Sequence, residues 1–120
     1  MSGRLPYPLV HLELHTDDFE GARTFYDGLC GWRQEQVDVP AGSYLALEFN
    51  ELVGGGIVEC PIQRPMWLPY FEVPRVECAT DQARLGGAAV LLEPREGPSG
   101  WRSVIRTAAG GELAFWQRKR

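Results

Sequence analysis

The stretch Val10–Trp32, VHLELHTDDFEGARTFYDGLCGW, decides the fold because its pattern changes from that of a strand to that of a helix. Its first residues alternate between apolar and polar, and successive side chains of a strand point to opposite faces. Thr16 or Asp17 can cap the helix that follows, and Glu20 stands where a capping box places an acid. Apolar side chains then recur at helical spacing up to Gly31, a residue type that commonly ends helices.

The rest of the chain continues this pattern and then repeats it. Three strand-like runs follow the first helix, and the third contains Gly54-Gly55-Gly56, which indicates a bulge or a close approach of backbones. A proline-containing linker at 61–65 precedes a second series of strand, helix and three strands, which includes a Pro- and Gly-rich loop at 94–100. The expected strands are 9–15, 32–39, 43–49, 52–59, 67–73, 88–92, 101–107 and 112–117, and the expected helices are 18–30 and 76–85.

The two series match at a nearly fixed offset. Leu29-Cys30-Gly31-Trp32 lies 56 residues before Leu85-Gly86-Gly87-Ala88. A long period that occurs twice indicates a duplicated supersecondary unit. We therefore expect an α+β fold in which two βαβββ modules form a curved, eight-stranded mixed sheet with the helices on the outside. The 120 residues would form a single domain of two pseudo-repeats, about 7–60 and 66–120, with a concave side suited to a small molecule.

Composition and charge argue against several classes of protein. A formal net charge of −4 differs from the basic surface that is typical of nucleic-acid binding. No run approaches the roughly 20 apolar residues of a membrane-spanning helix, and no signal peptide is visible. The three cysteines, Cys30, Cys60 and Cys78, are widely spaced and typical of reduced thiols. We expect a cytoplasmic protein with no nucleic-acid or membrane partner.

The first strand carries the polar residues that are best suited to binding or catalysis. His11, Glu13 and His15 point to the same face of it, and they include both histidines of the chain. Two imidazoles beside a carboxylate can hold a metal, line a cavity for a polar ligand, or face water. Alternate residues of a strand lie about 7 Å apart at Cα, which hinders three of them from converging on one ion.

Several motifs together resemble the vicinal oxygen chelate superfamily, which includes glyoxalase I, bleomycin-resistance proteins, fosfomycin-resistance enzymes and extradiol dioxygenases. In the first half the resemblance rests on the residues from His11 to Asp18 and on Phe25-Tyr26 followed by Leu29-Cys30-Gly31-Trp32. In the second half it rests on the runs 67–73, 85–87 and 110–116. The resemblance covers nearly the whole chain, and it implies paired modules, a small-molecule ligand and a homodimer.

The resemblance also implies where a divalent metal would bind. The family takes one ligand from the first strand and one from the last strand of each module. The matching positions are His11 and Glu59 in the first module, but Leu68 and Phe115 in the second, and neither of these two can bind a metal. Because a catalytic zinc site generally uses three protein ligands, we expect an incomplete metal site and no cofactor. A divalent metal at His11 and Glu59 is the alternative.

Eight side chains are candidates for contact with a ligand. They are His11, Glu13, His15, Glu48, Tyr70, Phe71, Trp101 and Arg102. For several of them an ordinary structural role is the competing interpretation. Glu13 and Glu48 can face solvent, Trp101 can belong to the core, and Arg102 can be an exposed charge.

Three functions are compatible with these features. The leading hypothesis is a small-molecule binding protein of the glyoxalase and bleomycin-resistance type, without a complete metal site. The first alternative is a metal-dependent lyase, isomerase or dioxygenase that uses His11 and Glu59, with Glu13 or Glu48 as general base. The second alternative is a structural or regulatory module that acts through its dimer interface.

Overall fold

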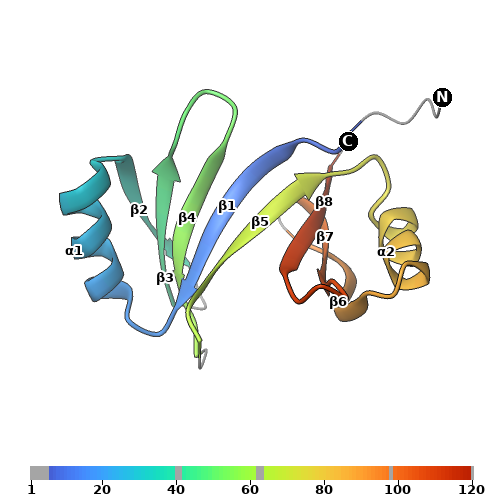
Figure 1. Cartoon of the computed structure of the whole chain (residues 1–120). Coiled ribbons are helices and arrows are strands. Elements are labelled where there is room, and N and C mark those ends of the chain that lie inside the picture. Colours follow the sequence, from blue (N-terminus) through green and yellow to red (C-terminus); the bar gives the residue numbers. More distant parts are fainter. Residues whose placement is uncertain (1–5, 40–41, 62–63, 98, 120) are drawn as a thin grey trace. The chain divides into compact units, whose positions relative to one another are not determined.

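The order of strands and helices follows the prediction from the sequence. The computed structural model describes residues 6–39, 42–61, 64–97 and 99–119, and it has an α+β fold with an eight-stranded mixed sheet and two helices (Figure 1). The chain divides into two compact units, Val10–Leu68, and Pro69–Arg120 together with the N-terminal residues up to Leu9. The boundary lies close to the start predicted for the second repeat. That the two repeats form a single domain stays a prediction.

The elements of the two series have the following bounds. The first series consists of β1 Leu9–Thr16, α1 Phe19–Cys30, β2 Arg33–Val39, β3 Gly42–Glu48 and β4 Gly54–Glu59. The second consists of β5 Met66–Glu72, α2 Val76–Leu85, β6 Ala89–Glu96, β7 Gly100–Arg106 and β8 Glu112–Arg118. Within the part of the chain that the structure describes, neither helix is long and apolar enough to cross a membrane.

Strand β6 departs most from the prediction, because it continues into the segment expected to be a loop. It is an edge strand, and its register with β7 shifts between Val90 and Leu92 and again between Leu92 and Arg95. Irregular pairing at a sheet edge accommodates a proline, which has no N–H group to donate. Pro94 therefore lies within β6 instead of ending it.

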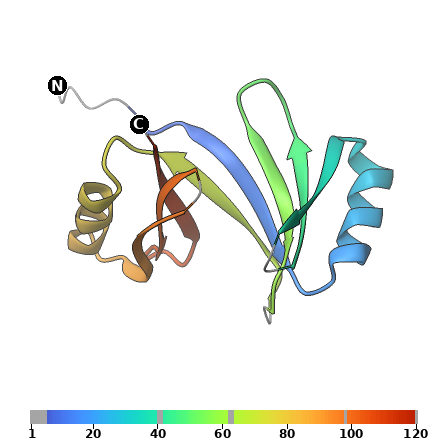
Figure 2. The same cartoon turned by 180° about the vertical axis from the view of Figure 1, so that it is seen from behind.

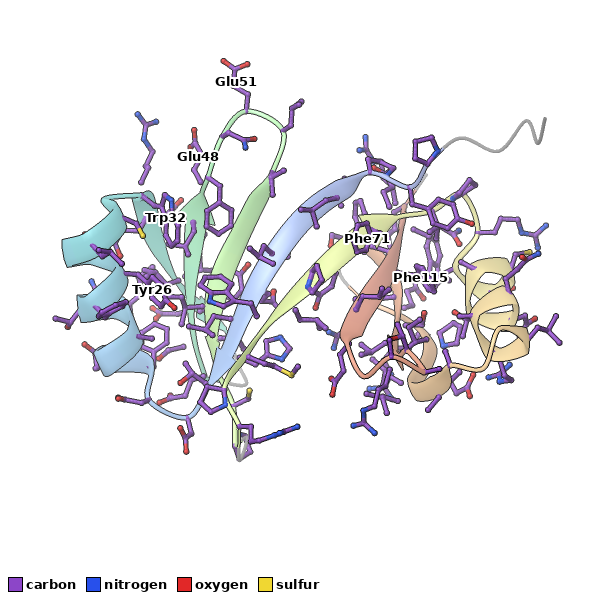
Figure 3. All side chains as sticks on the ribbon, viewed as in Figure 1. Tyr26, Trp32, Glu48, Glu51, Phe71 and Phe115 are labelled. Carbon is purple, nitrogen blue, oxygen red and sulfur yellow. The ribbon has the colours of Figure 1, made fainter. Side chains whose placement is uncertain are left out.

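The first unit packs α1 against one face of strands that lie in the order β2-β3-β4-β1 (Figures 1 and 2). Strands β1 and β4 are parallel, and the other pairs are antiparallel. The buried residues between helix and sheet are Leu14, Phe19, Leu45, Leu47 and Ile57. Aromatic side chains extend this core, and Tyr26 of α1 stacks on Trp32 with ring centroids 5.7 Å apart (Figure 3). We call the opposite face of these strands the helix-free face of the first unit.

Helix α1 has its N-cap one residue later than predicted. The Asp18 side chain accepts a 3.0 Å hydrogen bond from the Gly21 backbone N–H, whereas Thr16 Oγ1 accepts from the Asp18 N–H. A carboxylate at the N-cap satisfies one of the free N–H groups of the first turn. The helix ends as predicted at Gly31, whose φ of 63° lies in the left-handed region that glycine tolerates best.

The second unit packs α2 against one face of strands in the order β5-β8-β7-β6. Its core contains Val73, Val76, Ala79, Ile105 and Phe115. Two polar contacts join the helix to this face of the sheet. The hydroxyl groups of Thr80 and Ser103 lie 2.7 Å apart, and Gln117 Oε1 accepts from the Val76 N–H at 2.9 Å. Ser103 and Gln117 thus point to the α2 side. Their direct neighbours along β7 and β8 point to the opposite side, which we call the helix-free face of the second unit.

Candidate functional site

The strand register arranges the helix-free face of the first unit in three rows that run from β1 to β2. Side chains of directly paired residues point to the same side of a sheet. The rows are His11–Gly54–Glu48–Arg33, Glu13–Gly56–Ala46–Glu35 and His15–Val58–Tyr44–Val37. Glu48, a candidate from the sequence, is thus in the row of His11 but two strands away, about 10 Å at the backbone. Its side chain is exposed near the end of β3 (Figure 3).

His11, Glu13 and His15 form a continuous hydrogen-bonded array along β1. His11 Nε2 lies 3.0 Å from Glu13 Oε2, and His15 Nε2 lies 2.8 Å from Glu13 Oε1. The Glu13 side chain is only 13% exposed, against 30% for His11 and 22% for His15. An ionised carboxylate can only accept hydrogen bonds, so each imidazole donates from its Nε2–H. The array therefore holds a buried negative charge between two oriented rings.

The pKa of Glu13 is lowered by its two neighbours. Burial of the carboxyl group acts to raise the pKa, but the hydrogen bonds from His11 and His15 and their electrostatic attraction lower it to about 2, from 4.5. A carboxylate with this pKa is almost always ionised near neutral pH. Because a general base works best with a pKa near the working pH, Glu13 is poorly suited to accept a proton from a substrate. It is suited to orient the imidazoles.

Tyr44 is a residue of this face that the sequence did not single out. Its Oη donates a 3.3 Å hydrogen bond to the Gly55 carbonyl, and its ring lies over Gly56, the residue paired with Glu13. Burial, and then the negative charge of Glu13, raise the pKa of Tyr44 to about 12. Tyr44 is thus an uncharged aromatic group beside the array at neutral pH. The run of three glycines was the available signal, because it allows a close approach.

The residues do not fit the metal site that the family resemblance implies. Glu59 pairs with Thr16, five positions along β4 from Gly54, the partner of His11. Five residues of a strand span about 16 Å, and an odd step also turns the side chain to the other face. His11 and Glu59 therefore cannot ligate one ion, since metal–ligand bonds are about 2 Å long.

The remaining donors of the array are no better placed for a metal. Both oxygens of Glu13 accept from imidazoles, and both Nε2 atoms point at the carboxylate. Within residues 6–39, 42–61, 64–97 and 99–119, no group of three or more His, Cys, Asp and Glu side chains is arranged to hold a metal ion. Leu68, at a family ligand position, is a buried apolar side chain.

The candidates in the second unit fall on two different faces. Tyr70 and Arg102 share the helix-free face, where Arg102 Nη1 donates a 3.2 Å hydrogen bond to Tyr70 Oη. Phe71 pairs with the core residue Phe115 and so points to the α2 side (Figure 3). Trp101 also packs against the α2 core. Tyr70 and Phe71 therefore cannot line one cavity together, because neighbouring strand residues point in opposite directions.

Phe115, the position matched to the last family ligand, does not point to the helix-free face. Phe115 was matched to the glutamate of metal-dependent members, but its side chain lies in the α2 core. A step of one residue exchanges the faces of a strand. The residue of β8 that reaches the helix-free face beside Tyr70 is Ala114, which is fully buried. Alanine, like phenylalanine, offers no metal ligand.

Comparison with known proteins gives one pair of related sequences. No family model matches the chain. The chain is similar to “Putative glyoxylase CFP32” of Mycobacterium bovis and to the protein of that name from Mycobacterium tuberculosis, with 28% identity over 117 residues in each case. The aligned region covers 91% of this chain and 45% of each relative. The chain thus spans about half the length of the curated relatives it matches.

Solved structures show the same fold. Hypothetical protein BH1468 from Bacillus halodurans has a TM-score of 0.71 at 15% identity, covering 94% of this chain and 95% of that chain. A variant of Streptomyces coelicolor methylmalonyl-CoA epimerase in complex with 2-nitronate-propionyl-CoA has a TM-score of 0.69 at 13% identity, covering 93% and 94%. With its two βαβββ series, the chain therefore shares its fold with these proteins, as expected from the family resemblance of its sequence motifs.

Proposed function

We propose that the chain binds a small organic molecule on the helix-free face of its first unit, through the array of His11, Glu13 and His15 and without a metal. The observation that carries this proposal is the buried Glu13 carboxylate, which accepts a hydrogen bond from both imidazoles. A buried charge costs free energy unless it is paired and hydrogen-bonded. A sheet face that carries such a charge is therefore organised for recognition beyond what packing requires.

The array and its surroundings indicate the kind of molecule that would bind. His15 makes no hydrogen bond among the described residues other than that to Glu13, so its Nδ1 is available for a hydrogen bond with a ligand. Tyr44, in the row of His15, supplies an aromatic ring. At Gly54, in the row of His11, a Cβ would meet only the Leu47 carbonyl, at 3.9 Å. A compact ligand with an apolar part and a hydrogen-bond donor suits this surface.

The proposal is tested by NMR titration of ¹⁵N-labelled protein in EDTA with three probes of similar shape, namely benzyl alcohol, benzamidine and benzoate. Binding of at least one probe should shift the resonances of β1 and of Tyr44. Glu13→Gln should abolish those shifts, whereas Glu35→Gln, in the same row but exposed, should leave them unchanged. His15→Gln provides a second variant, in which Glu13 keeps one imidazole partner. If no probe shifts these residues, or if both glutamate variants behave alike, the proposal is wrong.

A proton-transfer enzyme is a second candidate, favoured by the 2.8 Å contact between His15 Nε2 and Glu13 Oε1. A carboxylate that orients an imidazole is a recurring device for a general base. The fold is also that of an epimerase, and the related sequence is named as a glyoxylase. Incorporation of deuterium from D₂O into methylmalonyl-CoA, absent in His15→Gln, would support an enzyme.

We also propose that the chain forms a homodimer, and size-exclusion chromatography with light scattering tests this.

A further inference from the structure

An arginine on the helix-free face of the second unit has a charge that none of the described carboxylates balances. Arg102 is partly buried on β7, and its Nη1 donates to Tyr70 Oη at 3.2 Å. A phenol is an uncharged acceptor at neutral pH, so this bond orients the guanidinium without neutralising it. Among the described residues, no Asp or Glu forms an ion pair with Arg102.

Three other arginines of this unit form ion pairs. Arg106, four residues further along the same strand, lies 3.4 Å from Glu112. Arg118 lies 3.4 Å from Glu72, and Arg84 lies 2.8 Å from Glu93. The side chains of these three paired arginines are 47–70% exposed, whereas Arg102 is only partly exposed. Of these four arginines, the least exposed one is thus the one without an anionic partner among the described residues.

A second cation adjoins Arg102. Arg95 of β6 pairs with Arg102 in the strand register, so the two side chains start from neighbouring positions on one face. Like charges directly opposite each other in a sheet destabilise it. Among the residues with a described placement, Arg95 also forms no ion pair. An oxyanion bound between the two guanidinium groups would remove this repulsion.

The small residue Ala114 allows Arg102 to reach Tyr70. Tyr70 of β5 pairs with Ala114 of β8, which in turn pairs with Val104 of β7. The Arg102 side chain therefore extends across β8, over a residue with no side chain beyond Cβ. One of its five N–H groups is used in the bond to Tyr70, and the others make no hydrogen bond to the described residues and can serve a ligand.

We propose that Arg102, oriented by Tyr70 and assisted by Arg95, is an anion-binding site for the carboxylate or phosphate group of a small molecule. The site lies in the second unit and does not depend on the function proposed for the array of the first unit. Guanidinium groups bind both oxyanions through paired N–H donors, and such charge-assisted hydrogen bonds are short and strong. Trp116 pairs with Arg102 in the register and gives the anion an aromatic neighbour.

The test is an NMR titration of the full chain with benzoate, phenyl phosphate and inorganic phosphate, and with benzylamine as the cationic control. The ¹⁵Nε signals of arginine report contact at each guanidinium directly. We expect shifts at Arg102 and Arg95 with the anions and none with benzylamine. A stronger response to phenyl phosphate than to benzoate would assign the site to phosphate esters, and the reverse order would assign it to carboxylates.

Four variants separate recognition from folding. Arg102→Gln should weaken anion binding about tenfold or more, the loss expected for a charge-assisted hydrogen bond. Arg102→Lys keeps the charge but loses the fork, and should recover only part of the affinity. Arg106→Gln, on the same strand and face but paired with Glu112, is the matched control and should bind within about twofold of the unchanged protein. Tyr70→Phe should weaken binding modestly while the protein stays folded.

Two outcomes would overturn the proposal. One is that none of the anions shifts the Arg102 signal at millimolar concentration. The other is that Arg102→Gln and Arg106→Gln reduce binding equally, which would indicate a general effect of positive charge. If Arg102→Gln fails to fold, Arg102→Lys and Tyr70→Phe decide the matter, because unchanged affinity in both would contradict a site built on this pair.

Discussion

The ring of Tyr44 occupies the space in which a side chain at Gly56 would stand. A Cβ built on Gly56 would lie 2.5 Å from both Cζ and Oη of Tyr44 and 2.9 Å from the Leu45 carbonyl. Since Gly56 pairs with Glu13, this contact brings an aromatic group beside the buried carboxylate. The glycine and the tyrosine therefore shape the helix-free face of the first unit together.

Replacing Gly56 by alanine should displace Tyr44 and lower the free energy of unfolding by about 1–3 kcal/mol, the usual cost of overpacking. Urea unfolding at pH 7 measures this loss. Gly54→Ala is the matched control, because it lies on the same strand and face and its Cβ would meet only the Leu47 carbonyl, at 3.9 Å. Its effect should be small. Equal losses in the two variants would contradict a specific contact between Tyr44 and Gly56.

Tyr44 should titrate with a pKa of about 12, raised from the ordinary 10.0. Because the folded-state pKa is raised above the ordinary 10.0, the associated stability is complete below pH 10 and is lost as the pH rises towards 12. Tyrosinate absorbance, followed in the unchanged protein and in Tyr44→Phe, measures this titration. The variant should lack a component that titrates near pH 12 in the unchanged protein. If the two proteins gave the same absorbance change between pH 11 and pH 13, the burial of this phenol would be contradicted.

Glu13→Gln should lower the free energy of unfolding at pH 7 by about 3 kcal/mol, the free-energy equivalent of a pKa lowered from 4.5 to about 2. The pKa is depressed in the folded state, so this stabilisation is complete above pH 4.5 and disappears as the pH falls through 2. Urea unfolding at pH 7, 4 and 3 should show a shallower acid dependence in the variant. Glu35→Gln should keep the steep acid dependence of the free energy of unfolding. If the unchanged protein lacked this steep dependence, the pairing of Glu13 with the two imidazoles would be refuted.

Chelation should leave the thermal unfolding midpoint and the probe titrations unchanged, because His11 and Glu59 are too far apart to share an ion. Elemental analysis of protein purified without chelators, together with calorimetric titration of Zn²⁺ and Mn²⁺, checks this. One equivalent of metal that is lost in both His11→Ala and Glu59→Gln would show that the two residues converge after all.

The sequence predicted the architecture well because the hydrophobic periodicity and the residues that begin or end helices and strands are local properties. The change of period near Asp18, the stop at Gly31 and the offset of 56 residues all follow from short-range preferences. The shared face of His11, Glu13 and His15 follows from alternation alone, and their hydrogen bonds agree with it.

The site was harder to predict because it depends on the register between strands. Tyr44 reaches Glu13 only through the pairing of β3 with β4 and of β4 with β1, which single-strand patterns do not contain. The same dependence explains why the sequence alone did not show that Phe115 points into the α2 core, or that Glu59 lies far from His11. A shift of a single residue exchanges the faces of a strand.

The most direct test of the central claim is the NMR titration of chelator-treated protein with benzyl alcohol, benzamidine and benzoate, compared across the unchanged chain, Glu13→Gln and Glu35→Gln. The account predicts metal-free binding that shifts β1 and Tyr44, disappears in Glu13→Gln and persists in Glu35→Gln. Binding that requires an added divalent metal, or probe shifts that are identical in the two glutamate variants, would contradict it.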